Sequence, residues 1–91
     1  MVIVGLDWFG NNAVRIACLH GATVYAVDKD SATFHSAEEQ GAQACFSRIA
    51  DVPVSVDAVV DFVGSEATII DSIAAVSAGG TVVVWASKRH L

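Results

Sequence analysis

The sequence has few charges, few basic residues and almost no proline. Only 16% of its 91 residues are charged, five of them are basic, and the net charge is −5. Five basic residues cannot form an extended positive face, so we expect no binding to nucleic acid or to an anionic membrane. One proline and 54% hydrophobic residues exclude a disordered or collagen-like chain. We therefore expect one small domain, residues 1–91, with an efficient core.

Long apolar runs and clustered cysteines are missing as well. No hydrophobic stretch approaches the ~18–20 residues of a transmembrane helix, and no basic leader precedes the first apolar run. Cys18 and Cys45 are too few for a disulfide framework or for a structural zinc site. Free thiols are typical of a reducing cytosol, so we expect a cytoplasmic protein whose cysteines are unreactive core residues.

Apolar runs and helical patterns alternate regularly along the chain. Runs of β-branched residues predict five strands, at 2–4, 23–27, 44–46, 58–63 and 81–85. Helical spacing predicts helices over 9–20 and 31–40, and a third from an N-cap at Ser65 to Gly79. Residues 47–56 are expected to be a loop with at most one helical turn. The alternation predicts an α/β fold: a doubly wound parallel sheet in three layers, with strand order 3-2-1-4-5.

The same spacing predicts which side chains the helices bury. The expected stripes are Phe9, Ala13, Ile16 and Ala17 in the first helix, Phe34 and Ala37 in the second, and Ile69, Ile70, Ile73 and Val76 in the third. The histidines fall at helix ends or in the tail, where we expect them to be solvated; they are His20, His35 and His90.

A glycine turn between the first strand and the first helix is the clearest functional signal. Gly5 to Gly10 reads G-L-D-W-F-G, where Rossmann-like dinucleotide-binding folds have G-x-G-x-x-G. Gly5 suits the tight turn and Gly10 suits close packing of helix on strand. Asp28 ends the second predicted strand, where an acid about 20 residues on binds the ribose hydroxyls of NAD and disfavours the extra phosphate of NADP. These residues, with Lys29 beside Asp28, predict an NAD site.

Asp7 stands where the middle glycine of the fingerprint normally lets the backbone approach the pyrophosphate. Its negative charge predicts low affinity for NAD. The same carboxylate can cap the first helix by accepting hydrogen bonds from its free N–H groups. Other interpretations stay open: the glycines and Asp28 can be purely structural, and Trp8 can be a packing or exposed aromatic.

These segments resemble the coenzyme-binding half of the medium-chain, zinc-type alcohol dehydrogenases. The similar segments are 2–6, 21–28, 38–42 and, most specifically, 57–64 and 79–84. The resemblance implies a cofactor, NAD, bound across the carboxyl ends of the strands, and hydride transfer to or from an alcohol or carbonyl carbon. It implies cofactor contacts from the turn, Asp28, and the ends of the last two strands: Gly5, Leu6, Asp7, Trp8, Phe9 and Gly10, then Asp28 and Lys29, Val63 and Gly64 on the adenosine side, and Val84 and Trp85 on the nicotinamide side.

The chain departs from that family at four points. Asp7 replaces a glycine, and Thr33 stands where a basic residue often lies near the adenosine ribose. The segment between Phe46 and Asp57 is short where the family has a further helix. The catalytic domain, with the cysteine and histidine ligands of its zinc, is absent, so we expect no catalytic activity from this chain alone.

The open edge of the last strand, 81–85, predicts a homodimer.

Two other functions fit the same turn. It also resembles the turn of potassium-channel regulatory domains, which would make the chain a nucleotide-sensing module. A Rossmann-like scaffold without a ligand, engineered or degenerate, is the other alternative, and Asp7 is its best support. A methyltransferase is a minor further option, because such enzymes share the glycine turn and the acid after the second strand.

Overall fold

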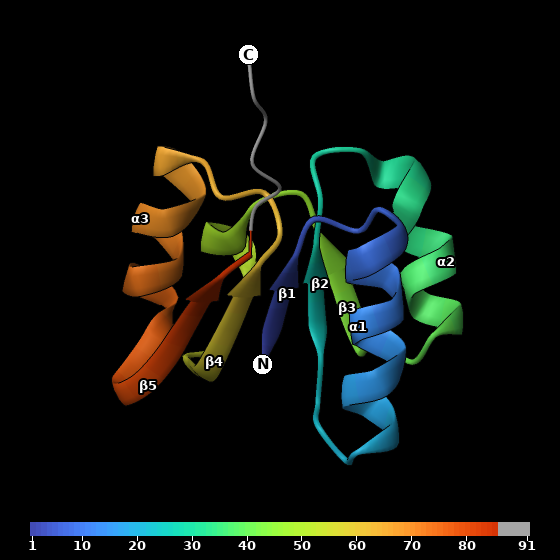
Figure 1. The fold of residues 1–91 in the computed structure, drawn as a ribbon, viewed down its shortest axis with the longest axis horizontal. Helices are drawn as coiled ribbons and strands as arrows, with labels where there is room; N and C mark the ends of the chain where they lie inside the picture. The colour runs from blue at the N-terminus through green and yellow to red at the C-terminus, as the bar shows by residue number, and fades with distance from the viewer. Residues whose placement is uncertain (86–91) are drawn as a thin grey trace.

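Five strands and three α-helices alternate in the computed structural model, which describes residues 1–85 (Figure 1). In chain order the elements are β1 (Val2–Val4), α1 (Trp8–Leu19), β2 (Tyr25–Val27), the 3-10 turn η1 (Ser31–Thr33), α2 (Phe34–Glu39), β3 (Ala44–Phe46), the 3-10 turn η2 (Ile49–Asp51), β4 (Val56–Asp61), α3 (Glu66–Ala75) and β5 (Val76–Val84). The expectation for His90 lies outside the described residues.

The sheet is parallel throughout and has the order β3-β2-β1-β4-β5, which confirms the predicted topology. Val4 of β1 is in register with Val27 of β2 on one side and with Asp61 of β4 on the other. Strands β1, β2 and β4 therefore end at one edge of the sheet. The strand order reverses direction between β1 and β4, which is where doubly wound folds bind their ligands.

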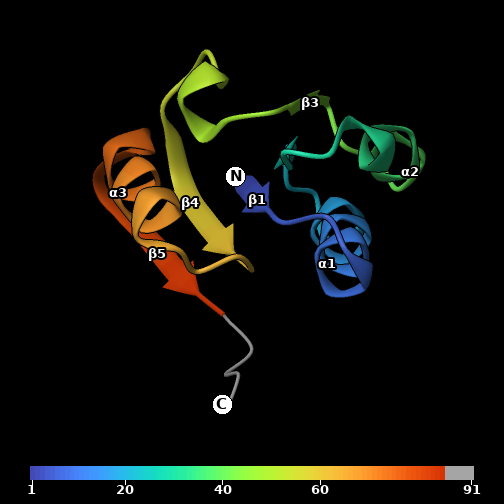
Figure 2. The ribbon, with the colours of Figure 1, turned by 90° about the horizontal axis from the view of Figure 1, so that it is seen from above.

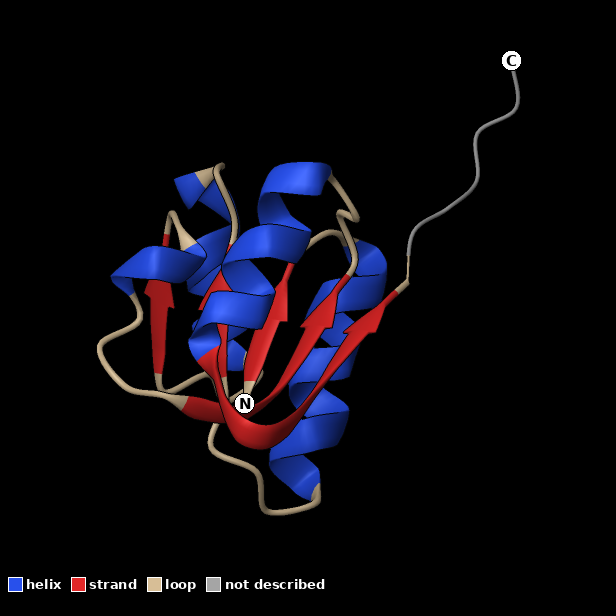
Figure 3. Ribbon diagram, turned by 90° about the vertical axis from the view of Figure 1, so that its left-hand side faces the viewer, coloured by secondary structure: helices blue, strands red, loops and turns tan. Residues whose placement is uncertain are grey.

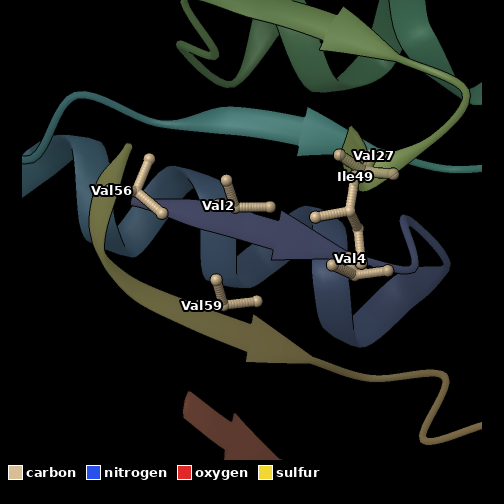
Figure 4. Close-up of a cluster of buried hydrophobic side chains, with 6 residues drawn as sticks. All are labelled: Val2, Val4, Val27, Ile49, Val56 and Val59. Atoms are coloured by element: carbon tan, nitrogen blue, oxygen red, sulfur yellow. The ribbon is translucent and has the colours of Figure 1, made fainter. Parts of the chain in front are cut away.

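Two apolar clusters hold the three layers together. Helices α1 and α2 cover one face of the sheet, and α3 covers the other (Figure 2). Under α1 and α2 the buried residues are Ile3, Leu6, Val14, Val24, Ala26 and Ala37. On the α3 face they are Val2, Val4, Val27, Ile49, Val56 and Val59 (Figure 4). Strand β1 contributes to both clusters because it is buried on both faces, as its uninterrupted apolar run predicts.

The ends of β4 and α3 differ from the sequence-based prediction. Strand β4 begins at Val56 and ends at Asp61, two residues earlier than expected, because the Asp61 side chain accepts hydrogen bonds from the next backbone N–H groups. The expected N-cap of α3 is confirmed: Ser65 and Thr68 form a capping box. The helix ends at Ala75 rather than near Gly79, because Val76 already pairs with Val56 of β4. The first part of β5 then bends through an irregularity before regular pairing resumes (Figure 3).

The predicted buried stripes are partly wrong. Ile70 and Ile73 of α3 are 59% and 62% exposed, and the residue that α3 buries fully is Ser72. Phe9 and Ile16 of α1 are also exposed, while Gly10 and Val14 are buried. Both helices rest on the sheet through a small residue, which brings the backbones close and turns the larger apolar side chains outward. The Ser72 hydroxyl is satisfied within its own helix, where it donates to the Thr68 carbonyl at 2.7 Å.

Candidate functional site

The turn after β1 is built around two glycines that no other residue can replace without strain. Gly5 has φ +90°, a conformation that side chains rarely adopt, and its N–H donates to the Val27 carbonyl at 2.8 Å. A Cβ on Gly10 would lie 1.6 Å from the Gly5 carbonyl oxygen. The tight turn and the close helix approach expected of Gly5 and Gly10 are both present. Their contact with a cofactor stays a prediction.

Asp7 caps the first helix. Its backbone is extended, with φ −72°, and its carboxylate accepts a hydrogen bond from the Gly10 N–H at 3.3 Å. The capping interpretation is confirmed, and the position does not require the positive φ that favours glycine. The carboxylate therefore lies at the positive end of α1, where an anionic ligand group would otherwise sit.

Asp28 joins the loops after β1 and β2, a role that the sequence did not reveal. One of its carboxylate oxygens accepts from the Leu6 N–H at 2.7 Å, and the other accepts from the Asp30 N–H at 2.9 Å. Each oxygen of an ionised carboxylate has a further acceptor site. Asp28 can thus hold the turn in place and still accept hydrogen bonds from a ligand hydroxyl.

A cavity of about 180 Å³ opens beside Asp28 at the carboxyl ends of the central strands. Three predicted site residues line it: Asp28, Lys29 and Val63. Its other walls are Val4, Val27, Ile49, Thr68 and Asp71. None of these five was predicted as a site residue. Val4 and Val27 are core residues of β1 and β2, and the last three come from η2 and from the first two turns of α3, where no local motif marks them. The volume is below the ~300–1,000 Å³ of whole-ligand pockets, so it fits one part of a dinucleotide.

The remaining predicted site residues lie outside that cavity. Trp8 and Phe9 are 72% and 57% exposed, and their rings meet edge to face at 5.0 Å. Val84 and Trp85, at the end of β5, are exposed as well. Gly64 has φ +70° and donates its N–H to the Asp61 carboxylate at 3.0 Å. These aromatic and apolar side chains surround the carboxyl edge without forming one closed pocket.

Asp61 is a further residue that sequence reasoning missed. It is fully buried and fixes the loop after β4, because one of its oxygens accepts from the N–H groups of Val63 and Gly64. Its other oxygen is buried without a hydrogen-bond partner among residues 1–85. The signal for this role was its place in an apolar strand, three residues before Gly64.

The cysteines have the environment expected of unreactive thiols. Both pack against the core under α1 and α2, and the Cys45 thiol contacts the Phe34 carbonyl oxygen at 3.6 Å. Burial, and secondly the negative charge of Glu38, raise the pKa of Cys45, so the thiol stays protonated at neutral pH.

Residues 1–85 contain no group of three side chains placed to hold a metal ion. None of the helices in that range is long and apolar enough to cross a membrane.

Comparisons with known proteins match this geometry. The sequence model of the zinc-binding dehydrogenase family matches residues 9–90. A probable zinc-binding alcohol dehydrogenase of Mycobacterium tuberculosis is 36% identical over an alignment of 91 positions. The alignment covers 92% of this chain and 24% of that protein.

Solved structures give the same result. AibC superposes with a TM-score of 0.85 at 33% identity, over 94% of this chain and 27% of its own. Acetophenone reductase from Geotrichum candidum, solved with NAD, has a TM-score of 0.80 at 31% identity, over 89% of this chain and 24% of its own. A protein from Sinorhizobium meliloti, solved with NADP, has a TM-score of 0.83 at 30% identity, over 99% of this chain and 32% of its own.

The fold is thus that of a Rossmann-like α/β domain. The chain belongs to the zinc-binding dehydrogenase family. It spans about a quarter of the length of the curated relative, at 24% of that protein.

Proposed function

We propose that this chain is the NAD(H)-binding domain of a zinc-type alcohol dehydrogenase. The observation that carries the proposal is the hydrogen bond from the Leu6 N–H to the Asp28 carboxylate. It places the glycine turn and the acid of the dinucleotide fingerprint side by side, next to a cavity at the point where the strand order reverses. Family membership supports the same function.

The described residues fit the adenosine half of the cofactor better than its phosphates. The apolar walls Val4, Val27 and Val63 suit a base, and Asp28 is in reach of hydroxyl groups at the rim. The pyrophosphate would approach the N-terminus of α1, where the Asp7 carboxylate opposes it. The nicotinamide would lie toward Val84 and Trp85. When bound, it would accept or donate the hydride, and this chain would supply binding and orientation only.

The rest of the reaction would depend on protein outside this chain. The relatives are three to four times longer, since the chain covers only 24–32% of each. We propose that a catalytic domain supplies the zinc ligands, the proton relay and most of the substrate pocket. On this basis the 91-residue chain binds the cofactor without oxidising alcohols, and its natural partner is that domain.

Titration with NADH tests the proposed function directly. NADH fluorescence should change saturably, and the emission of the exposed Trp8 and Trp85 should be quenched. The affinity should be low because of Asp7, with Kd in the range of ~0.1–1 mM. Absence of any saturable change up to several times that concentration, with the chain folded by circular dichroism, would refute dinucleotide binding.

Asp28 should decide between NAD and NADP. A carboxylate favours the ribose hydroxyls and repels a 2′-phosphate, so NAD should bind more tightly by ~1–3 kcal/mol. Asp28→Ala should bring the two affinities together. The ratio of affinities is the proper measure, because losing the bond to the Leu6 N–H disturbs the turn for both ligands alike. Asp30→Asn, in the same loop, should retain the preference, and equal affinities in the parent chain would contradict the assignment.

We also propose self-association through the open edge of β5. The Trp85 N–H donates to the Asp61 carbonyl in β4, so the alternation of a parallel strand turns the N–H of Val84 outward. An unpaired edge of this kind can pair with a second copy. Analytical ultracentrifugation should show concentration-dependent dimers. Val84→Pro, which removes that outward donor, should abolish them, while Val84→Ala should not. A parent chain that stays monomeric at high concentration would contradict the proposed self-association.

A further inference from the structure

A second and larger cavity, of about 410 Å³, lies on the α3 face, away from the glycine turn. It opens between the η2 turn with its following loop and the C-terminal half of α3. Its apolar lining includes Ile49, Val52, Pro53, Val54, Ala74 and Ala75. This volume falls within the range of small-molecule sites, and the dinucleotide site proposed above does not use it.

The polar side chains that line this cavity are one carboxylate and one hydroxyl. Asp71 contributes a carboxylate and Ser55 a hydroxyl, and Pro53 has a carbonyl but no N–H. Helix α3 ends at Ala75, on the cavity wall, and carries no basic residue in its last turn. A helix C-terminus presents free carbonyls and about half a negative charge. The cavity therefore combines apolar walls with an electronegative end.

No positive charge within residues 49–85 compensates these groups, and the nearest in sequence is Arg48, directly before the cavity wall at Ile49. Residues 49–85 contain no lysine, arginine or histidine, but they contain five acids: Asp51, Asp57, Asp61, Glu66 and Asp71. Among residues 1–85 the single ion pair joins His35 to Glu39, so no cationic side chain there lies within 4 Å of the Asp71 carboxylate; Lys29 lines the smaller cavity together with Asp71 but does not pair with it. A cation bound beside Asp71 would be its first partner.

We propose that this cavity binds a small organic cation, an ammonium group on a short apolar body. The ammonium would pair with the Asp71 carboxylate near the end of α3, and the hydrocarbon would cover the alanine, valine and proline walls. One carboxylate among apolar side chains does not meet the several oxygen ligands that a metal ion requires. An anion would be repelled by the Asp71 carboxylate and by the carbonyl end of α3.

The two cavities share Ile49 and Asp71 as walls. If the proposed dinucleotide site holds, a bound ammonium would neutralise an acid beside an anionic cofactor. The amine should then tighten NADH binding, and NADH should tighten amine binding by the same factor. This coupling depends on the proposed function, whereas amine binding itself does not.

Amine binding is tested on the chain without any dinucleotide, with n-butylamine as probe and n-butanol and butyrate as matched neutral and anionic ligands. Amide NMR shifts should change saturably at residues 49–52, 54–55 and 71–75, with a millimolar Kd for butylamine. Butanol should bind at least about fivefold more weakly and butyrate not at all, because only the cation gains a charge-assisted bond. Asp71→Asn should weaken butylamine by a similar factor and leave butanol unchanged.

The control variant is Asp57→Asn, which removes the same charge outside the cavity wall and should alter butylamine affinity less than about twofold. Three results would each overturn the proposal. They are equal affinities for butylamine and butanol, equal effects of Asp71→Asn and Asp57→Asn on butylamine affinity, and no saturable shift up to roughly 100 mM butylamine. If Asp71→Asn fails to fold, the comparison of the three ligands on the unchanged chain decides the question. A chain that binds butylamine but not NADH would refute the proposed function alone.

Discussion

Gly10→Ala is expected to lower the free energy of unfolding by more than ~3 kcal/mol, a large part of the ~5–15 kcal/mol that small domains have. The added Cβ would lie 1.6 Å from the carbonyl oxygen and 2.8 Å from the carbonyl carbon of Gly5. Both are backbone atoms in a turn held by hydrogen bonds from Gly5 to Val27 and from Leu6 to Asp28. Neither atom can move aside without separating α1 from β1.

Gly21→Ala is the matched control for this substitution. Gly21 has φ +90°, but nothing lies within 4 Å of the position its Cβ would take. Only backbone strain is added there, at a cost of ~1–2 kcal/mol. Urea denaturation of both variants measures the difference, and failure of Gly10→Ala to fold agrees with the expectation. A Gly10→Ala chain as stable as Gly21→Ala would show that the turn is not closely packed.

The sheet could be predicted because its signals are local. Each strand is an apolar run closed by a turn residue, and parallel strands joined by right-handed crossovers leave few possible orders. The Asp7 cap and the Ser65 cap were also predictable, since a capping side chain binds N–H groups within its own first turn. The helical turn in 47–56 was visible only as weak spacing, and it is η2 in the structure.

The helix faces could not be predicted in the same way. Helix α3 carries isoleucines on more than one side, so periodicity alone does not say which side meets the sheet. The structure places Ser72 against the sheet and leaves Ile70 and Ile73 exposed. Gly79 resembled a helix stop, as glycines beyond a last turn often are. Pairing of Val76 with Val56 ended the helix four residues sooner.

The candidate site also combines residues that the sequence predicts with residues that only tertiary packing brings in. The glycine turn and Asp28 were found from the dinucleotide fingerprint, and Val63 from the resemblance to the dehydrogenase family. Ile49, Thr68 and Asp71 reach the cavity only through the packing of η2 and α3 beside β1 and β2. The hydrogen bond between Leu6 and Asp28 spans 22 residues of sequence, so it follows from the parallel pairing of β1 and β2 rather than from either residue alone.

Substitutions of Asp7 should separate its two roles, as helix cap and as internal anion at the phosphate site. Asparagine is as good an N-cap as aspartate, so Asp7→Asn should leave the melting temperature nearly unchanged while removing the negative charge. Repulsion between that charge and a pyrophosphate a few ångströms away is ~1–3 kcal/mol at a surface site. NADH should therefore bind about tenfold more tightly to Asp7→Asn, as measured by fluorescence titration.

Asp7→Gly tests the capping role of Asp7 by removing the capping side chain. It removes the carboxylate that accepts from the Gly10 N–H, which costs a few tenths of a kcal/mol for glycine at an N-cap, and it also frees the backbone in the unfolded chain, so it should lower stability by ~0.5–1.5 kcal/mol in all. It should tighten NADH binding at least as much as Asp7→Asn, because it restores the glycine of the fingerprint and removes the side chain as well as the charge. The backbone at Asp7, with φ −72°, gives glycine no conformational advantage.

A gain in melting temperature for Asp7→Gly would contradict the capping role. Unchanged NADH affinity in both variants would instead show that the carboxylate does not face the phosphates, and the low affinity would then need another cause.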